Sequence, residues 1–196
     1  MKKFITFLSL SFLMFSCDVA NQVMGTYQLT QCKYEYQSIS GLTLAGINLQ
    51  NANGLASLNP LSLASLTSAF SSKNGSLPFN FTLNLGISNP NIQAAIINGL
   101  GYILEVDGHE LTTGTVDKHL QIDGGQRSVL PINMAFDLKK ALNGESMESI
   151  KRLAFNFAGI GNETSNVTIR IKPNFKVGNQ IIAAPNYIPV SFQLNK

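Results

Sequence analysis

Apolar and polar residues alternate with a period of two along much of this chain. In residues 79–88, every odd position is apolar and every even position is small or polar. Because successive side chains of a β-strand point to opposite faces, this segment predicts a strand with one face on a core and the other in water. The same pattern predicts further strands over 102–106, 116–122, 130–138, 153–157, 167–171 and 188–194, and two more are expected in 24–37 and 41–49.

Turn residues separate these predicted strands. Pro90 lacks a backbone donor and cannot continue a central strand, so Asn89-Pro90-Asn91 is expected to end one strand and to start the connection to the next. Its role is predicted to be structural, with an outward-facing ligand loop as the alternative. The other expected turns, the first two of them hairpin turns, are Asp107-Gly108, Asp123-Gly124-Gly125 and Gly161-Asn162.

Two segments have helical patterns instead. Asn59 can cap a helix that begins at Pro60, and apolar side chains then recur on one side up to Ser71. A second, shorter helix is expected over 145–152. A set of one-sided strands in one domain, with one or two short helices, predicts an all-β fold class, a two-sheet β-sandwich.

The N-terminus has a different pattern. Lys2 and Lys3 precede an apolar run that ends at Ser16, which is typical of a secretory signal peptide. The run is shorter than the roughly 18 residues expected of a transmembrane helix. Cys17, directly after a small residue, resembles the lipid-attachment site of a bacterial lipoprotein. That resemblance implies that the Cys17 thiol takes a diacylglyceryl group and that the chain is cut before it.

These features divide the chain into a lipoprotein signal peptide at 1–16, a membrane tether at 17–22 and a β-sandwich domain at 23–196. The implied location is the bacterial cell envelope, where the membrane is a partner through the N-terminal lipid. Asp18 resembles an inner-membrane retention signal of enteric bacteria, but that rule does not hold across bacteria, and the outer membrane is expected. The alternative is an ordinary secreted protein in which Cys17 is incidental.

Charge and cysteine content narrow the picture further. The formal net charge of +3 includes Lys2 and Lys3, and the other basic residues are scattered without interleaved aromatic residues, so no nucleic-acid partner is expected. The chain has 2 cysteines, so a lipid on Cys17 leaves Cys32 without a partner. Cys32 shares one predicted strand face with Tyr34, and a buried, unreactive thiol is expected there rather than a redox group.

Residues 79–138 carry a family resemblance. The alternating strand runs into 88–91, an aromatic-led strand at 100–108 ends in Asp-Gly, a glycine follows in 111–114, and a Val-x-Pro sequence closes 127–131. In this order the pieces resemble the late-embryogenesis-abundant type 2 domain, also called the water-stress and hypersensitive-response (WHy) domain.

The resemblance implies an immunoglobulin- or fibronectin-III-like sandwich of seven strands with one helix. It also implies no catalytic residues and no cofactor, and it suggests a part in stress protection, as a bacterial lipoprotein. Two segments, 55–76 and 139–151, exceed what the compact family domain needs, and a dedicated ligand site is expected there if the protein has one.

The sequence offers few residues for metal binding or catalysis. His109 and His119 are the only histidines, and with nearby carboxylates they are weak candidates for a zinc site. An exposed polar strand face explains both histidines better, so no metal is expected. The chain has neither a Gly-x-Ser-x-Gly nucleophile turn nor a glycine-rich phosphate loop between strand and helix.

The sequence therefore predicts a membrane-anchored envelope lipoprotein that is not an enzyme, with a β-sandwich domain for binding, scaffolding or stress protection. Another envelope protein is a candidate partner. The alternative is a glycan- or protein-binding accessory lipoprotein of an uptake or adhesion system, although the chain has no Trp on which a sugar could stack. A hydrolase is the third interpretation.

Overall fold

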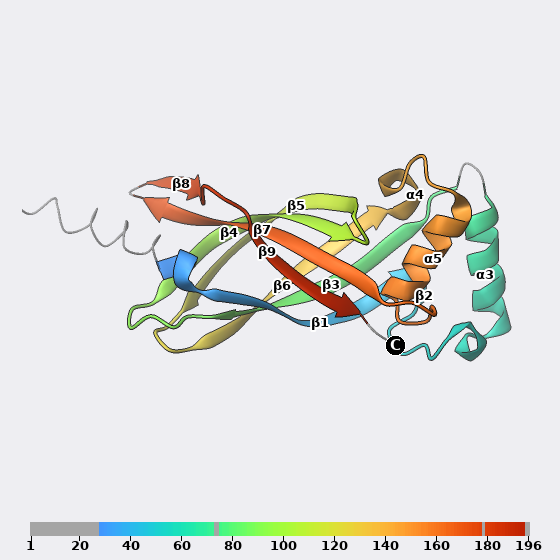
Figure 1. Ribbon diagram of the computed structural model, residues 1–196, viewed down its shortest axis with the longest axis horizontal. Coiled ribbons are helices and arrows are strands. Elements are labelled where there is room, and N and C mark those ends of the chain that lie inside the picture. Colours follow the sequence, from blue (N-terminus) through green and yellow to red (C-terminus); the bar gives the residue numbers. More distant parts are fainter. Residues whose placement is uncertain (1–27, 73–74, 178, 195–196) are drawn as a thin grey trace, which may run out of the picture.

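Two antiparallel sheets face one another in the computed structural model, which describes residues 28–72, 75–177 and 179–194 (Figure 1). One sheet has the order β2 (Ile47–Asn48), β1 (Lys33–Leu44), β3 (Pro78–Ser88), β6 (Arg127–Asp137). The other has the order β5 (His109–Ile122), β4 (Ala95–Val106), β7 (Ser165–Val177), β8 (Gln180–Ala183), and β9 (Ile188–Leu194) also pairs with β7. The architecture confirms the predicted all-β fold class, a β-sandwich.

β3 is a central strand of the first sheet, paired with β1 on one side and β6 on the other. Thr82 and Asn84 lie on its partly exposed face. One-sided burial of this kind is the physical basis of the alternation in the sequence. Five apolar side chains of the opposite face are at most 3% exposed: Phe79, Phe81, Leu83, Leu85 and Ile87.

The helices gather at one end of the sandwich (Figure 1). They are the short 3₁₀ helix η1 (Leu55–Ser57), α3 (Pro60–Ser71), α4 (Leu138–Ala141) and α5 (Met147–Phe157). The predicted helix 60–71 is confirmed, and the Asn59 side chain accepts a hydrogen bond from the Ser62 backbone amide at 2.8 Å, as a helix cap does. Residues 28–31, which are also helical, lie at the opposite end of the sandwich.

α5 is attached to the core through an aromatic cluster. The ring of Phe157 lies 5.3 Å from that of Phe79 and 4.9 Å from that of Phe81, measured between ring centroids. Phe136 of β6 packs edge-on against Phe79 at 5.7 Å. The helix therefore closes this end of the sandwich, and its C-terminal half is buried.

The prediction of a strand over 153–157 is wrong, because this segment is the C-terminal half of α5. The short helix expected over 145–152 is present but is longer than predicted, because it runs from Met147 to Phe157. Ser146 caps it, since the Ser146 hydroxyl accepts a hydrogen bond from the Ser149 backbone amide. Leu138, expected to end a strand, is instead the first residue of α4.

Two other expectations also need correction. Of the strand expected in 24–37, residues 28–31 are helical and only the part from Lys33 is a strand; it continues as the long strand β1 into the segment 41–49, where the two-residue β2 follows. Gly41, with a φ of 65°, lies in a register shift of β1 and does not end the strand. The 123–125 turn is not a hairpin turn, because it joins β5 and β6, which belong to different sheets.

Candidate functional site

The segments 55–76 and 139–151, singled out from the sequence as additions to a compact sandwich, come together at one end of the molecule. We call this end, formed by α3, α4, α5 and their loops, the helical end. Lys139 of α4 joins the two segments, because its Nζ donates to the carbonyl oxygens of Ala69 at 2.8 Å and Ser72 at 2.6 Å, at the C-terminus of α3. Carbonyl groups at a helix C-terminus lack partners within the helix, so a lysine is well matched to them.

A polar cavity of about 270 Å³ lies at the helical end, beside the turn between β4 and β5. It is lined on the sheet side by Asp107 and His109, and on the helix side by Glu145, Arg152 and Glu163. Asp107-Gly108 forms the β4–β5 hairpin turn, and both of its residues have positive φ angles, 49° and 83°. The sequence predicted this hairpin, but it did not indicate that the turn would face α5.

Several groups of the polar cavity have partners within the protein. The Asp107 carboxylate accepts from the Asn166 backbone amide at 2.8 Å, which ties the β4–β5 turn to β7. Buried Asn156 donates to the Glu163 carboxylate at 3.2 Å and accepts from the Glu163 backbone amide at 3.3 Å. His109 Nδ1 lies 3.9 Å from Glu145 Oε1. These interactions hold the α5–β7 loop and the hairpin turn in fixed positions.

Within the described ranges, the serine hydroxyl that lines the polar cavity is not hydrogen-bonded to a base. A serine nucleophile needs its hydroxyl within hydrogen-bond reach of a base. Ser149 also lines the cavity, but its hydroxyl lies 2.9 Å from that of Ser146, and within the described residues no hydrogen bond joins it to His109. The three carboxylates and the guanidinium are better suited to holding a polar ligand by hydrogen bonds and ion pairs.

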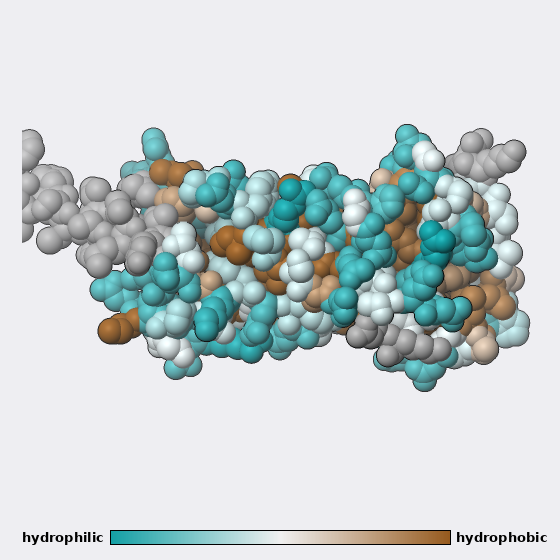
Figure 2. Space-filling model, in the orientation of Figure 1, coloured by the Kyte–Doolittle hydropathy of each residue, from teal (hydrophilic) through white to brown (hydrophobic). Residues whose placement is uncertain are grey.

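An apolar groove of about 270 Å³ lies between α3 and α5. Leu66 and Phe70 of α3 and Phe155 of α5 contribute to its lining. At this end Leu61 is 78% exposed, and Met147 at the start of α5 is partly exposed. Figure 2 shows apolar surface over α3 at this end. The helical end thus offers a polar cavity and an apolar groove on either side of α5.

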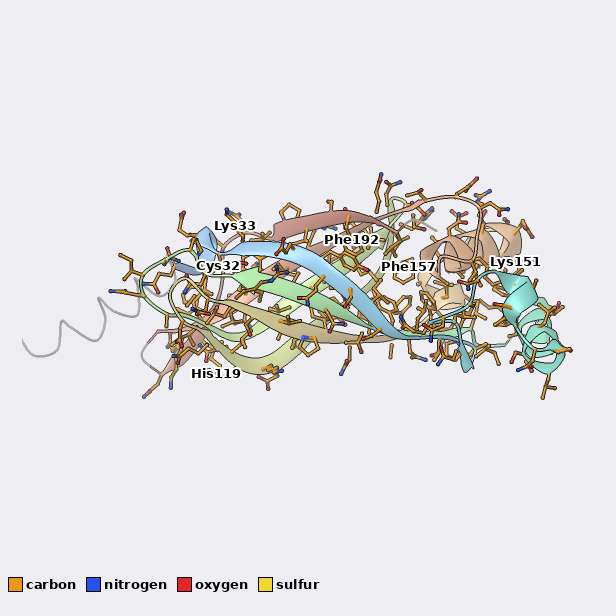
Figure 3. The ribbon with its side chains drawn as sticks, turned by 90° about the horizontal axis from the view of Figure 1, so that it is seen from below. Cys32, Lys33, His119, Lys151, Phe157 and Phe192 are labelled. Atoms are coloured by element: carbon orange, nitrogen blue, oxygen red, sulfur yellow. The ribbon has the colours of Figure 1, made fainter. Side chains whose placement is uncertain are left out.

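His109 and His119 do not come together. Both lie on β5, ten residue steps apart, which corresponds to roughly 33 Å along an extended strand. His119 lies at the end of the sandwich far from the helices (Figure 3). The distance from its Nδ1 atom to the Asn98 side-chain oxygen is 2.8 Å. Within the part of the chain that the structure describes, no group of three or more His, Cys, Asp or Glu residues could hold a metal ion.

Asn89 of the Asn89-Pro90-Asn91 segment is only 1% exposed. Its side-chain nitrogen donates to the carbonyl oxygens of Gln93 at 2.8 Å and Ile122 at 2.9 Å, and its side-chain oxygen accepts from the Asn91 amide at 3.1 Å. The amide is thus used within the protein, as a buried polar group requires. This geometry supports a structural role for the segment over a ligand loop.

The predicted lipid-attachment residue, Cys17, and the rest of 1–27 lie outside the described residues. Cys32 is buried, and burial raises the pKa of its thiol to about 11. A thiol with so high a pKa is neutral at ordinary pH and is a poor nucleophile.

Among the described residues, no helix is both apolar enough and long enough to span a membrane.

No protein-family model matches this chain, and no curated protein matches it. Similar solved structures include a crystal structure from Archaeoglobus fulgidus, with 10% identity, covering 83% of this chain and 98% of that one, at a TM-score of 0.39. A protein from Arabidopsis thaliana has 12% identity, coverage of 60% and 70%, and a TM-score of 0.41. A protein described as late embryogenesis abundant has 11% identity, coverage of 97% and 88%, and a TM-score of 0.40. TM-scores this low carry no argument about relationship or function.

Proposed function

We propose that this protein is a lipid-anchored envelope protein whose non-catalytic β-sandwich presents its helical end, away from the membrane, to a binding partner. The observation that carries the proposal is the opposed placement of the two ends. Gln28, eleven residues after Cys17, lies at one end, and the polar cavity and apolar groove lie at the other. A strand of 12 residues, such as β4, spans about 40 Å, so the helical end stands well clear of the tether.

Two groups of the polar cavity already have structural roles, which favours a non-catalytic interpretation of the cavity. Asp107 and Asn156 are committed to holding the hairpin turn and the α5–β7 loop. The exposed Leu61 of α3, together with Leu63 and Met147, which are exposed and line the apolar groove, supports a protein partner, because exposed apolar side chains around a groove are common at protein interfaces. Scaffolding or stress protection of the late-embryogenesis-abundant type is consistent with this arrangement.

Metabolic labelling with a fatty-acid analogue tests the anchor. The wild-type protein should incorporate the label, and Cys17→Ala should not. Cys32→Ala is the matched control, because its thiol is buried in the domain and its loss should leave labelling intact. Equal labelling of the wild type and Cys17→Ala would overturn the anchor.

Site-specific photo-crosslinking in intact cells tests the binding surface. A photoreactive residue in place of Leu61 should give a discrete cross-linked product. The same residue in place of Thr115, on the exposed face of β5, should give none. A cross-linked product from the Thr115 position but not from the Leu61 position would show that the partner binds the sheet, and would contradict the proposal.

The polar cavity favours one alternative, a glycan-binding accessory lipoprotein, because hydroxyl groups of a sugar can pair with its carboxylates and with Arg152. A thermal-shift panel of envelope saccharides distinguishes a glycan ligand from a protein partner. Stabilisation that Arg152→Ala removes would favour the glycan, whereas no shift with any saccharide favours a protein partner. A hydrolase would instead show turnover that is lost in His109→Ala.

A further inference from the structure

We infer that the end of the sandwich opposite the helices docks on the membrane surface, with apolar side chains inserted among the lipid headgroups. We call this end the loop end. It comprises the 89–94 loop, the 123–126 connection and β8. The inference rests on the proposed lipid anchor and adds a second, independent contact between the domain and the bilayer.

Isolated apolar side chains protrude from the loop end. Ile92, in the 89–94 loop, is 99% exposed, and Ile181 and Ile182 of β8 are 63% and 41% exposed. Apolar surface is visible over β8 in Figure 2. Exposed apolar side chains on separate protrusions can each enter the fluid headgroup region, whereas a protein partner would need a matched pocket for each one.

The tether leads directly to this surface. The side chain of Gln28, the first described residue, donates to the Gln93 side chain at 2.6 Å, and Asn91 donates to the Gln28 carbonyl oxygen at 3.1 Å. The start of the domain is therefore bonded to the loop that carries Ile92. The eleven residue steps from Cys17 to Gln28 span at most about 40 Å when fully extended, so a lipid on Cys17 keeps the loop end close to the bilayer.

The charge of the loop end suits an anionic headgroup surface. Figure 3 shows Lys33 at this end, next to Cys32. Arg127 and Glu35 form an ion pair at 2.8 Å and offset one another. Lysines outnumber the remaining acids near this end among the described residues: Lys33, Lys118 and Lys176 against Asp117 and Asp123. Lysines near a membrane attract anionic lipids, and their effect falls off within a Debye length.

Three features thus coincide at one end: protruding isoleucines, an excess of lysine, and the start of the tethered domain. The helical end also has an exposed leucine, Leu61, but it lies a full strand length from Gln28. Leu61 therefore serves as an internal control for exposure without proximity to the membrane.

The chain contains no tryptophan, so one introduced indole reports on one position. The experiment uses the lipidated full-length protein with Ile92→Trp, reconstituted in vesicles of three parts phosphatidylethanolamine to one part phosphatidylglycerol. Lipids brominated on the acyl chain should quench the emission of this indole at least twofold, and aqueous iodide should quench it weakly. Leu61→Trp, at a largely exposed position of the helical end, should be quenched by iodide and not by the brominated lipids.

A second variant and a charge reversal complete the test. Ile181→Trp should behave as Ile92→Trp does, which covers the case in which one variant fails to fold. In the Ile92→Trp background, Lys176→Glu should reduce lipid quenching on anionic vesicles by about half, and neutral phosphatidylcholine vesicles should erase that difference.

The outcomes separate this inference from the proposed function. If the protein does not float with the vesicles, the proposed lipid anchor is wrong, and the inferred docking surface is wrong as well. If the protein floats but the indoles of Ile92→Trp and Ile181→Trp are as open to iodide as that of Leu61→Trp, the anchor stands and the docking surface is wrong. An Ile92→Trp indole that is open on vesicles but shielded in native envelopes would assign the loop end to a protein partner, and would also overturn the inference.

Discussion

The side-chain nitrogen of Asn89 donates to the backbone carbonyl of Ile122 at 2.9 Å, so one buried amide joins the end of β3 to the end of β5 in the other sheet. The same amide reaches Gln93 in the following loop. Gly124 allows this close approach, because a Cβ at that position would lie 2.0 Å from the Ile92 carbonyl oxygen. Asn89 is therefore a bridge between the sheets as well as part of a turn.

Asn89→Ala should lower the free energy of unfolding by about 3 kcal/mol, because it leaves buried carbonyl groups without donors and removes the bridge. Urea melts measure the loss. Asn133→Ala is the control, since Asn133 is exposed and accepts from Thr82 at 2.9 Å, and it should cost under about 0.5 kcal/mol. A well-folded Asn89→Ala protein of unchanged stability that failed to bind its partner would show that the segment is a binding loop.

Phe81→Ala should cost about 3–5 kcal/mol, because it leaves a cavity between Phe79 and Phe157 in the aromatic cluster. Thr82→Ala, on the opposite face of β3, should cost well under about 1 kcal/mol. Denaturant melts of the two variants test the one-sided burial of β3. Similar losses at both positions would contradict it.

Lys139→Met should destabilise the helical end by about 1–2 kcal/mol, because the carbonyl oxygens of Ala69 and Ser72 lose a charged donor. Hydrogen exchange should quicken in the last turn of α3 before it changes in the sheets. Lys140→Met is a matched control, since Lys140 is exposed on the same short helix, and it should change little. Uniform quickening across the sheets would mean that α3 does not open separately.

Stability should fall as the pH rises from about 9 to about 11, in part because of Cys32. Burial raises the pKa of this thiol from 9.0 to about 11, so over this range the unfolded chain loses a proton that the folded chain keeps. Cys32 therefore contributes stability below pH 9 that is lost through this window. Burial also raises the pKa of Tyr34, which extends the loss to higher pH. Urea melts at pH 8, 9.5 and 11 should show a shallower loss for Cys32→Ala than for the wild type, and parallel losses would contradict this explanation.

Sequence periodicity predicted β3 because burial there is almost entirely one-sided, with Gly86 the one buried residue of the other face. It failed at 153–157 because burial there is not one-sided: Ala154 and Asn156 are buried along with Leu153, Phe155 and Phe157. A residue spacing of three and four was also present, from Ile150 to Leu153, Ala154 and Phe157, and this spacing is typical of a helix. Alternation over only three apolar residues does not distinguish a strand from a helix that is buried all round.

The candidate site was only partly predictable for a different reason. The Asp-Gly sequence predicted the Asp107-Gly108 turn, because such a turn depends only on local backbone geometry. The approach of Glu145 and Glu163 to that turn depends on how β4, β7 and α5 pack, and no local pattern encodes it. Sequence reasoning missed both acids and Arg152. The signals that pointed to this region were the 139–151 segment, as an addition to a compact sandwich, and His109, as a weak metal candidate.

The length of β1 determines how the domain would respond to a pulling force. Its 12 residues run from the loop end, where Lys33 pairs with Ser88, to the helical end, where Leu44 pairs with Phe79. An extended strand rises about 3.3 Å per residue and is already near the length limit of the chain. Beyond β1, the chain passes through the two-residue β2 to α3. A pulling force applied between Gln28 and α3 would therefore travel along β1, a single strand that is already nearly fully extended, and would load its hydrogen bonds to β3 in shear.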